Sequence, residues 1–464
     1  MTMLKRRDAL LGGLAGSGYL GLRALATGLP AWFLVNPRRA NAQTLQCMID
    51  AKDKMQFLVV STSFNGDPVN CNCPGTYENT DAIHPQQTEV EQTTVMLGSK
   101  SYGAALPWAD PAVTSKDGSA KGQLKAATLA RTSFFHHMTL STTHGDQPKV
   151  MKLQGATTGG EMMISAYAKH LAPCLGTIQA EPVALGAHGN AAELVSYGGR
   201  TLPSISPTQL KTLLTGSKND TLVKLRSMRD MELNKLNALA KQDATSVQAQ
   251  FLDALANSQT QVRALADALS TTLNAITADD VKGQALAAAA LFSAKVTPVA
   301  TIHIGFGGDN HSDQNLQAEA DQHVSGVAAI QTVMDAMASL SIADNVTFAT
   351  MNVFGRNLNG ISKVLSRAGR DHYGNHNVGV LIGKNIAPSV IGGITGASSG
   401  YVASDIKSAD GTAVSGGDIP ASQTMVSMAR TLGVALGIPA SVLDADFTSA
   451  AGGKVVPAAL NGVG

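Results

Sequence analysis

The chain has 464 residues, of which 44% are apolar and 15% charged, and its formal net charge is +1. This composition is typical of a globular protein with a large core, and the length allows two or three domains or one elaborated α/β domain. No basic stripe runs along the sequence, which argues against a nucleic-acid partner.

The first 42 residues have the pattern of an export signal. A basic start with Arg6-Arg7 leads into a Gly-interrupted apolar run that ends at Ala40-Asn41-Ala42, which predicts twin-arginine export and cleavage near Ala42. A membrane anchor is the less favoured alternative, because the glycines make the run less apolar than a spanning helix requires. Residues 1–42 carry a net charge of +5, so the mature chain is near −4. We expect a periplasmic or extracellular protein without a transmembrane segment in its mature part.

Four cysteines lie in the mature part: Cys47, Cys71, Cys73 and Cys174. An even number of cysteines in an exported protein favours disulfides, although spacing alone leaves the connectivity open. The Cys71-x-Cys73 pair could instead bind a metal, but no nearby cluster of cysteines or histidines completes such a site. We therefore expect structural disulfides.

Five short apolar runs, rich in β-branched residues, alternate with polar or helical segments. They span residues 57–62, 134–143, 299–304, 346–351 and 378–382. Runs this short and apolar predict buried parallel strands, and hence an α/β fold. The first four lead into Gly- or Asn-containing segments with polar residues, whereas the fifth follows Asp371-His372. Because ligands collect beyond the carboxyl ends of strands in open α/β sheets, these polar residues are candidates for one site.

Helical spacing of Leu and Ala dominates between the strands. Residues 207–290 predict a helical insertion of two or three helices that covers the sheet or forms a cap. A partner-binding coiled coil is the alternative there, although no heptad is sustained, so a protein partner for this insertion stays open. Residues 316–340 predict an amphipathic helix on a right-handed crossover to the strand at Val346. Residues 421–436 predict a closing helix, and 446–464 form a tail without periodicity.

Five side chains at these strand ends form a mixed oxygen and nitrogen ligand set: Asp67, Asp309, His311, Asp371 and His372. Zn²⁺ accepts imidazole and carboxylate together, whereas Mg²⁺ and Ca²⁺ prefer oxygen. The set therefore predicts one or two divalent metals, with zinc favoured and Mg, Mn or Ca open. Two neighbouring metals would clamp a phosphoryl or sulfuryl centre.

Several of these segments carry a family resemblance. They are residues 305–314 (GFGGDNHSDQ), Phe354-Gly355-Arg356, 369–373 (GRDHY) and Gly392-Gly393. In this order, after a twin-arginine signal, they resemble the DUF1501 family of exported bacterial proteins, within the alkaline phosphatase and sulfatase superfamily. The resemblance covers residues from about 55 to 443. It implies a three-layer α/β/α sandwich with a mostly parallel central sheet over residues 43–445, with metal ligands at the strand ends.

The resemblance also assigns expected roles to residues. Asp67 is similar to the metal-binding Asp after the first strand, and Asp309 and His311 are similar to the middle metal motif. Asp371 and His372 are similar to the consecutive Asp-His of the superfamily's phosphatases. These matches imply metal ligands at all five positions.

Three further residues are candidates for catalysis and substrate binding. His144 stands where those enzymes begin a helix with a Ser, Thr or Cys nucleophile, and its imidazole could act as ligand, general base or nucleophile. Arg356 and Arg370 are candidates for binding the substrate anion, with pairing to a structural carboxylate as the equal alternative.

Two functions follow from this sequence. The first is an exported metal-dependent hydrolase that acts on small or polymeric phosphate or sulfate esters. The second is a non-catalytic binding or assembly protein that keeps the fold, since fold alone does not guarantee chemistry. The second function is motivated by His144 in the nucleophile's place and by the absence of any His after His376.

Overall fold

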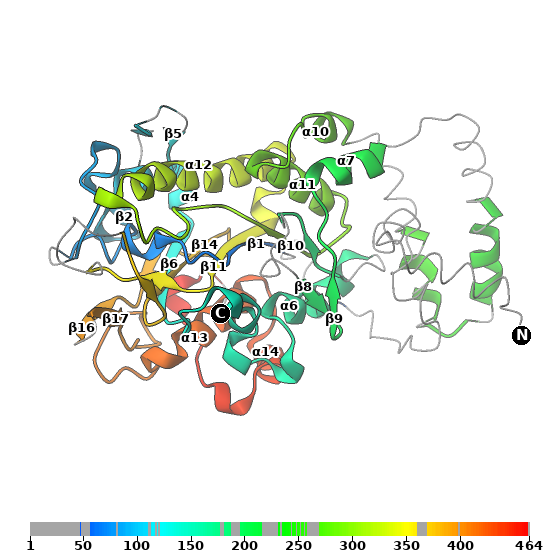
Figure 1. Cartoon of the computed structure of the whole chain (residues 1–464). Coiled ribbons are helices and arrows are strands. Elements are labelled where there is room, and N and C mark those ends of the chain that lie inside the picture. Colours follow the sequence, from blue (N-terminus) through cyan, green and yellow to red (C-terminus); the bar gives the residue numbers. More distant parts are fainter. Residues whose placement is uncertain are drawn as a thin grey trace, which may run out of the picture.

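The computed structural model describes most of the chain after residue 55 (Figure 1). The described residues are 47, 56–79, 82–109, 113–116, 118, 121–176, 181–186, 195–215, 269–359, 369–397 and 400–462, with short pieces between 231 and 257. The predicted signal at 1–42 and residues 216–230 of the predicted insertion lie outside them. No helix in the described ranges is both long and apolar enough to cross a membrane.

A seven-stranded sheet with the order β15-β6-β14-β11-β1-β10-β7 forms the centre of the molecule. The strands are β1 Phe57–Ser63, β6 Thr132–His137, β7 Val183–Ala184, β10 Val299–Ile302, β11 Val346–Asn352, β14 Asn377–Ile382 and β15 Ser389–Ile391. Strand β1 pairs in parallel with β10 and β11, and β15 pairs in parallel with β6. The predicted α/β fold with a mostly parallel sheet is confirmed.

One strand of this sheet differs from the prediction. Strand β14 pairs antiparallel with both β11 and β6, so the expectation that all five runs are parallel is wrong for 378–382. The reversal has a consequence for Asp371-His372, which precede β14. The amino end of an antiparallel strand lies at the same edge as the carboxyl ends of its parallel neighbours, so this pair still reaches the edge where ligands collect.

Strand β1 shows why the sheet is covered on both faces. Its seven residues are all buried, and successive side chains of a strand point to opposite faces. Phe57 and Val59 belong to one apolar cluster, and Leu58 and Val60 to another. Each cluster therefore needs its own covering layer of helices.

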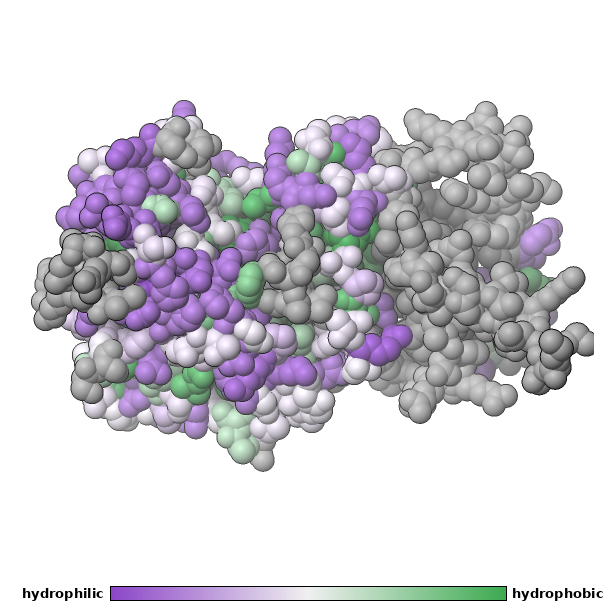
Figure 2. All heavy atoms as spheres, in the orientation of Figure 1, coloured by the Kyte–Doolittle hydropathy of each residue, from purple (hydrophilic) through white to green (hydrophobic). Residues whose placement is uncertain are grey.

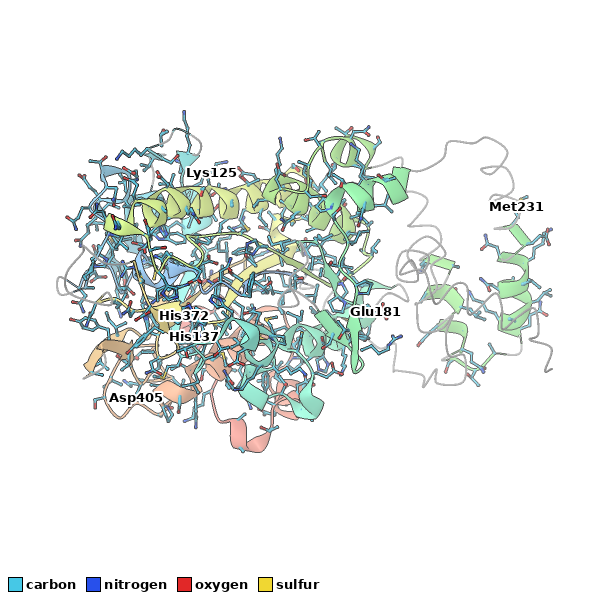
Figure 3. The ribbon with its side chains drawn as sticks, viewed as in Figure 1. Lys125, His137, Glu181, Met231, His372 and Asp405 are labelled. Atoms are coloured by element: carbon cyan, nitrogen blue, oxygen red, sulfur yellow. A yellow bond between two sulfur atoms is a disulfide. The ribbon has the colours of Figure 1, made fainter. Side chains whose placement is uncertain are left out.

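Helices supply those two layers (Figure 1). Helices α11 Val281–Ser293 and α12 Gln317–Ser339 contribute to the first cluster, and α6 Met163–Leu171 and α13 Thr424–Ala435 to the second. Side chains fill the space between these helices and the sheet (Figure 3). The result is the three-layer α/β/α sandwich that the sequence led us to expect.

Shorter elements complete the fold. Among the other α-helices in the described part of the chain are α4 Ala126–Leu129, α5 Gln147–Met151, α7 Pro207–Thr215, α10 Ser270–Asn274 and α14 Ala440–Asp446. Two-stranded ribbons pair β2 Gln92–Leu97 with β3 Lys100–Ala105, β4 Val113–Thr114 with β5 Lys121–Gly122, β8 Val195–Tyr197 with β9 Arg200–Leu202, β12 Gly355–Arg356 with β13 His372–Tyr373, and β16 Ile394–Ala397 with β17 Gly400–Ala403. Hydrophilic residues cover much of the face that Figure 2 shows.

The C-terminal segment packs onto this domain. Phe447, Val456 and Ala459 are buried in the cluster beneath the sheet, and Leu460 forms a β-bridge with Ile386. Segment 446–464 therefore contributes to the core, although its sequence lacks the periodicity that would predict a buried segment.

The cysteines follow the prediction only in part. Cys47 and Cys174, 127 residues apart, form a disulfide. Cys71 and Cys73 are buried free thiols, so the expectation of a bridge is wrong for this pair. Burial raises the pKa of Cys73 to about 12, so this thiol stays protonated at neutral pH.

Candidate metal centre

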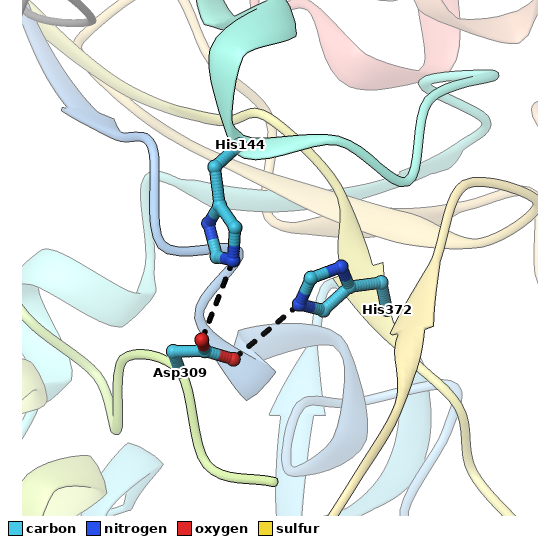
Figure 4. A group of neighbouring side chains, drawn as sticks. All are labelled: His144, Asp309 and His372. Carbon is cyan, nitrogen blue, oxygen red and sulfur yellow. Dashed lines mark hydrogen bonds and ion pairs between the residues drawn. The ribbon is translucent and has the colours of Figure 1, made fainter.

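Three side chains from distant parts of the chain meet beyond the strand ends (Figure 4). Asp309 lies in the loop after β10, His144 follows β6, and His372 is in β13, before the antiparallel β14. One ligand atom from each lies within 4.8 Å of the others. The side chains of His144, Asp309 and His372 keep 32%, 42% and 21% of their surface exposed, so the group is open to solvent.

The Asp309 carboxylate lies between the two rings. Its Oδ2 is 3.3 Å from His144 Nε2, and its Oδ1 is 3.3 Å from His372 Nε2. Phe354 holds both rings in place, because it stacks on His372 at 4.2 Å and meets His144 edge-on at 5.1 Å between ring centroids. The rings are thus fixed with both Nε2 atoms toward one carboxylate.

The opposite ring nitrogens decide where the protons lie. His144 Nδ1 is 2.7 Å from the backbone oxygen of Phe64, and His372 Nδ1 is 2.7 Å from that of Thr142. A carbonyl oxygen only accepts, so both Nδ1 atoms carry the proton and donate. In a neutral imidazole, Nε2 then presents a lone pair. Metal-bound histidines commonly show this second hydrogen bond to a carbonyl, which fixes the tautomer.

The electrostatics favour a neutral ring facing a charged carboxylate. Burial lowers the pKa of His372 and outweighs the hydrogen bond to Thr142, which acts in the opposite direction. Partial burial of Asp309 works to raise its pKa, but the hydrogen bond and charge of Arg356 prevail and hold it below the usual value. At neutral pH a lone pair on His372 Nε2 therefore lies beside a charged carboxylate, and a cation bound to both residues would stabilise this arrangement. The residues fit a metal.

Two more of the predicted ligands adjoin this group. His311 Nε2 lies 2.8 Å from His372 Nε2 and 3.1 Å from Asp309 Oδ1, and His311 Nδ1 lies 3.4 Å from Asp371 Oδ1. One neutral imidazole can donate to the other, so the contact between His311 and His372 requires no ion. The structure thus brings four of the five predicted ligands together, with the catalytic candidate His144 among them.

Asp67 is the predicted ligand that the structure places differently. Its side chain is fully buried, and its Oδ1 accepts a 2.7 Å hydrogen bond from the backbone of Gly308. Gly308 has φ of +55°, a conformation that glycine adopts at little cost. Asp67 therefore supports the loop that carries Asp309, and it is not one of the three residues whose ligand atoms cluster.

The two candidate anion-binding arginines are buried and engaged within the protein. Arg356 Nη2 donates to Asp309 Oδ1 at 2.8 Å, and Arg370 binds both oxygens of the buried Glu319, at 2.7 and 3.1 Å. Their other donors bind backbone carbonyls. The structure therefore shows the alternative interpretation, pairing with a carboxylate, for both side chains.

The residues that hold the two arginines in place could not be predicted from the sequence. Glu319 lies in the first turn of α12, where acidic residues are common at the surface. Asn70 brackets the backbone of Arg356, since its Oδ1 accepts from Arg356 N at 2.9 Å and its Nδ2 donates to Arg356 O at 2.8 Å. Neither residue stands in a recognisable motif, so only tertiary contacts reveal its role.

The chain matches no protein-family model and no curated protein. The fold and the site by themselves define an α/β/α sandwich whose strand-end loops carry a group of side chains that could hold a metal ion.

Proposed function

We propose that the protein is an exported metal-dependent hydrolase of phosphate or sulfate esters and belongs to the DUF1501 family. The observation that supports this most directly is the group of His144, Asp309 and His372 at the strand ends, with two fixed imidazole lone pairs toward one carboxylate. Its exposure to solvent leaves room for a substrate.

Each residue of the group has a part in this proposal. His144 and His372 would hold the metal through Nε2, and Asp309 through a carboxylate oxygen. Two nitrogens and one oxygen are a set that suits zinc better than Mg²⁺ or Ca²⁺. When bound, such a metal polarises an ester oxygen and makes water more acidic. His311, whose Nε2 lies 3.1 Å from Asp309 Oδ1, is placed to contact a substrate or a second metal.

A metal count combined with an ester panel tests the proposal. The purified mature protein, supplied in turn with zinc, manganese and magnesium, is assayed on aryl phosphates and aryl sulfates. We expect at least one metal per chain and turnover of one ester class, both lost in Asp309→Asn. Asp335→Asn is the matched control, because this exposed carboxylate lies on α12 and pairs with Lys125. Bound metal without turnover of any ester would rule out the hydrolase.

A non-catalytic binding or assembly protein is the second candidate. One observation favours it: Leu236 and Leu239 in the predicted insertion are each 60% exposed. Deletion of residues 216–268 separates the two functions. A binding protein would lose its co-purifying partner on deletion, whereas a hydrolase would keep its metal and its turnover.

We also propose export by the twin-arginine route. The Cys47–Cys174 disulfide supports an oxidising location, since disulfides persist outside the cytosol. Replacement of Arg6 and Arg7 by lysine should leave the precursor in the cytoplasm. Unchanged export of that variant would contradict the route.

A further inference from the structure

We propose that Arg356 is a positioning residue of the candidate metal centre, which presents one oxygen of Asp309 to the cation and thereby favours zinc-type ions. The inference rests on the metal site of the proposed function. It assigns Arg356 a role through Asp309, without contact to a substrate.

Arg356 connects three of the loops around the centre. Its Nε donates to Gly66 O at 2.6 Å, its Nη1 to Arg370 O at 3.1 Å, and its Nη2 to Asn65 O at 2.7 Å. These carbonyls belong to the loop after β1 and to the segment before β13. Nη2 also lies 3.2 Å from Gly308 O, in the loop after β10. One guanidinium therefore fixes the three loops relative to each other.

The same side chain orients the Asp309 carboxylate. Arg356 Nη2 donates to Oδ1 at 2.8 Å, while Oδ2 faces His144 Nε2 at 3.3 Å. Pairing between β12 and β13 also sets Arg356 directly opposite His372. With Oδ1 held by the guanidinium, Oδ2 is the oxygen left for a cation, together with the Nε2 atoms of the two imidazoles. The guanidinium thus holds the carboxylate in an orientation suited to a cation, which preorganises the site.

Charge explains the preference for zinc-type ions. Arg356 neutralises Asp309, so the cation meets two neutral imidazoles and a carboxylate whose charge is already balanced. Mg²⁺ and Ca²⁺ bind where several oxygens surround them, and Mg²⁺ gives up its water reluctantly. Zinc accepts imidazole nitrogen and needs fewer carboxylates. Arg356 therefore lowers the affinity for hard cations, whereas for zinc the orientation that it gives Asp309 outweighs the charge that it neutralises.

Arg370 offers a matched control for a buried arginine. Arg370 is as buried as Arg356 and also pairs with a carboxylate, but that carboxylate is Glu319. The hydrogen bonds of the Arg370 side chain go to Glu319 and to backbone carbonyls of Asn357, Leu358 and Ile83. Arg370→Lys should therefore lower thermal stability and leave the zinc affinity of the folded protein unchanged.

The experiment measures zinc affinity by chelator competition in the full mature chain, for Arg356→Lys, Arg356→Gln and Arg370→Lys. Lysine keeps the charge of Arg356 but not its fork of donors. We expect both Arg356 variants to bind zinc about 10- to 100-fold more weakly than the wild type, the usual effect of losing a group that orients a ligand. The preference for zinc over magnesium should narrow, and the visible spectrum of bound Co²⁺ should change.

Two results would overturn the inference: wild-type affinity in Arg356→Gln, or an equal loss of affinity in Arg370→Lys. If the Arg356 variants do not fold, a crystal structure of the zinc-loaded wild type decides. Zinc on Oδ2 with the Arg356 contact intact supports the inference, and a displaced Arg356 overturns it. Zinc binding without ester turnover would contradict only the proposed function, whereas a wild type that binds no zinc would refute both.

Discussion

Two groups of histidines lie close together in the sequence and have opposite surroundings. His144 and His372 are partly exposed, and each directs Nε2 toward the Asp309 carboxylate. His136 lies eight residues before His144 and His376 four after His372, yet both are fully buried. The comparison shows that the groups a ring meets, and not its residue type, decide between a candidate ligand and a structural role.

The inner group, His136 and His376, has a hydrogen-bond partner for every ring nitrogen. His136 Nε2 is 3.0 Å from Pro74 O, which only accepts, so His136 Nδ1 is the acceptor. His376 Nε2, 3.0 Å away, then donates to it, and His376 Nδ1 accepts from Asn70 Nδ2 at 3.1 Å. This chain is complete with both rings neutral. In the outer group, His144 and His372, the Nε2 atom of His144 faces the Asp309 carboxylate, which has no proton to donate, and this deficit is what makes the group a metal candidate.

Acid should lower the free energy of unfolding through the buried histidines, and this is the largest effect we expect. Burial lowers the pKa of His136 and His137 to about 4, and burial together with the neighbouring imidazoles lowers that of His376. Unfolded imidazoles titrate near 6.5, so below that pH the unfolded chain binds more protons and the free energy of unfolding falls. Each such ring contributes a loss of about 2 kcal/mol by pH 5.

Urea unfolding at a series of pH values measures this loss. Stability should be fully present above pH 6.5 and should decline down to about pH 4, where the folded rings protonate. A flat profile between pH 7 and pH 5 would contradict the neutral buried rings.

A pair of substitutions four residues apart separates the two groups directly. His376→Leu leaves the buried His136 Nδ1 without its donor, so we expect a loss of about 2–3 kcal/mol in the free energy of unfolding. His372→Leu, at a partly exposed site, should change stability by less than about 1 kcal/mol but weaken zinc binding strongly. Denaturant unfolding and zinc titration of both variants measure this. Equal stability losses in the two variants would remove the distinction.

His323 gives the smallest effect and tests whether a buried histidine needs partners. It is fully buried in α12 against Trp108, and neither ring nitrogen has a hydrogen-bond partner. Burial lowers its pKa to about 3. His323→Leu should therefore raise the free energy of unfolding at pH 7 by about 1 kcal/mol, because it removes unsatisfied polar atoms. Destabilisation of this variant would show that a polar partner, such as water, satisfies the ring.

The sequence alone determined the α/β fold and the positions of its main strands and helices. Short, β-branched apolar runs such as 57–62 predict buried strands, and polar residues after them collect at one edge, since parallel strands end there. This local reasoning brought Asp309, His311, Asp371 and His372 to one place. The same reasoning predicted wrongly that β14 is parallel, because a hydrophobic pattern carries no information about strand direction.

Only the tertiary structure decided which of the neighbouring residues are candidate ligands and which have a structural role. Asp67 and Asp309 follow similar strands, yet one is buried on a backbone amide and the other is exposed between two imidazoles. His372 and His376 are four residues apart, yet the first is partly exposed and the second is buried. Arg356 pairs with a carboxylate 47 residues away in the sequence. These outcomes depend on which carbonyls and carboxylates the fold brings within 3 Å, and contacts between distant segments leave no trace in local pattern.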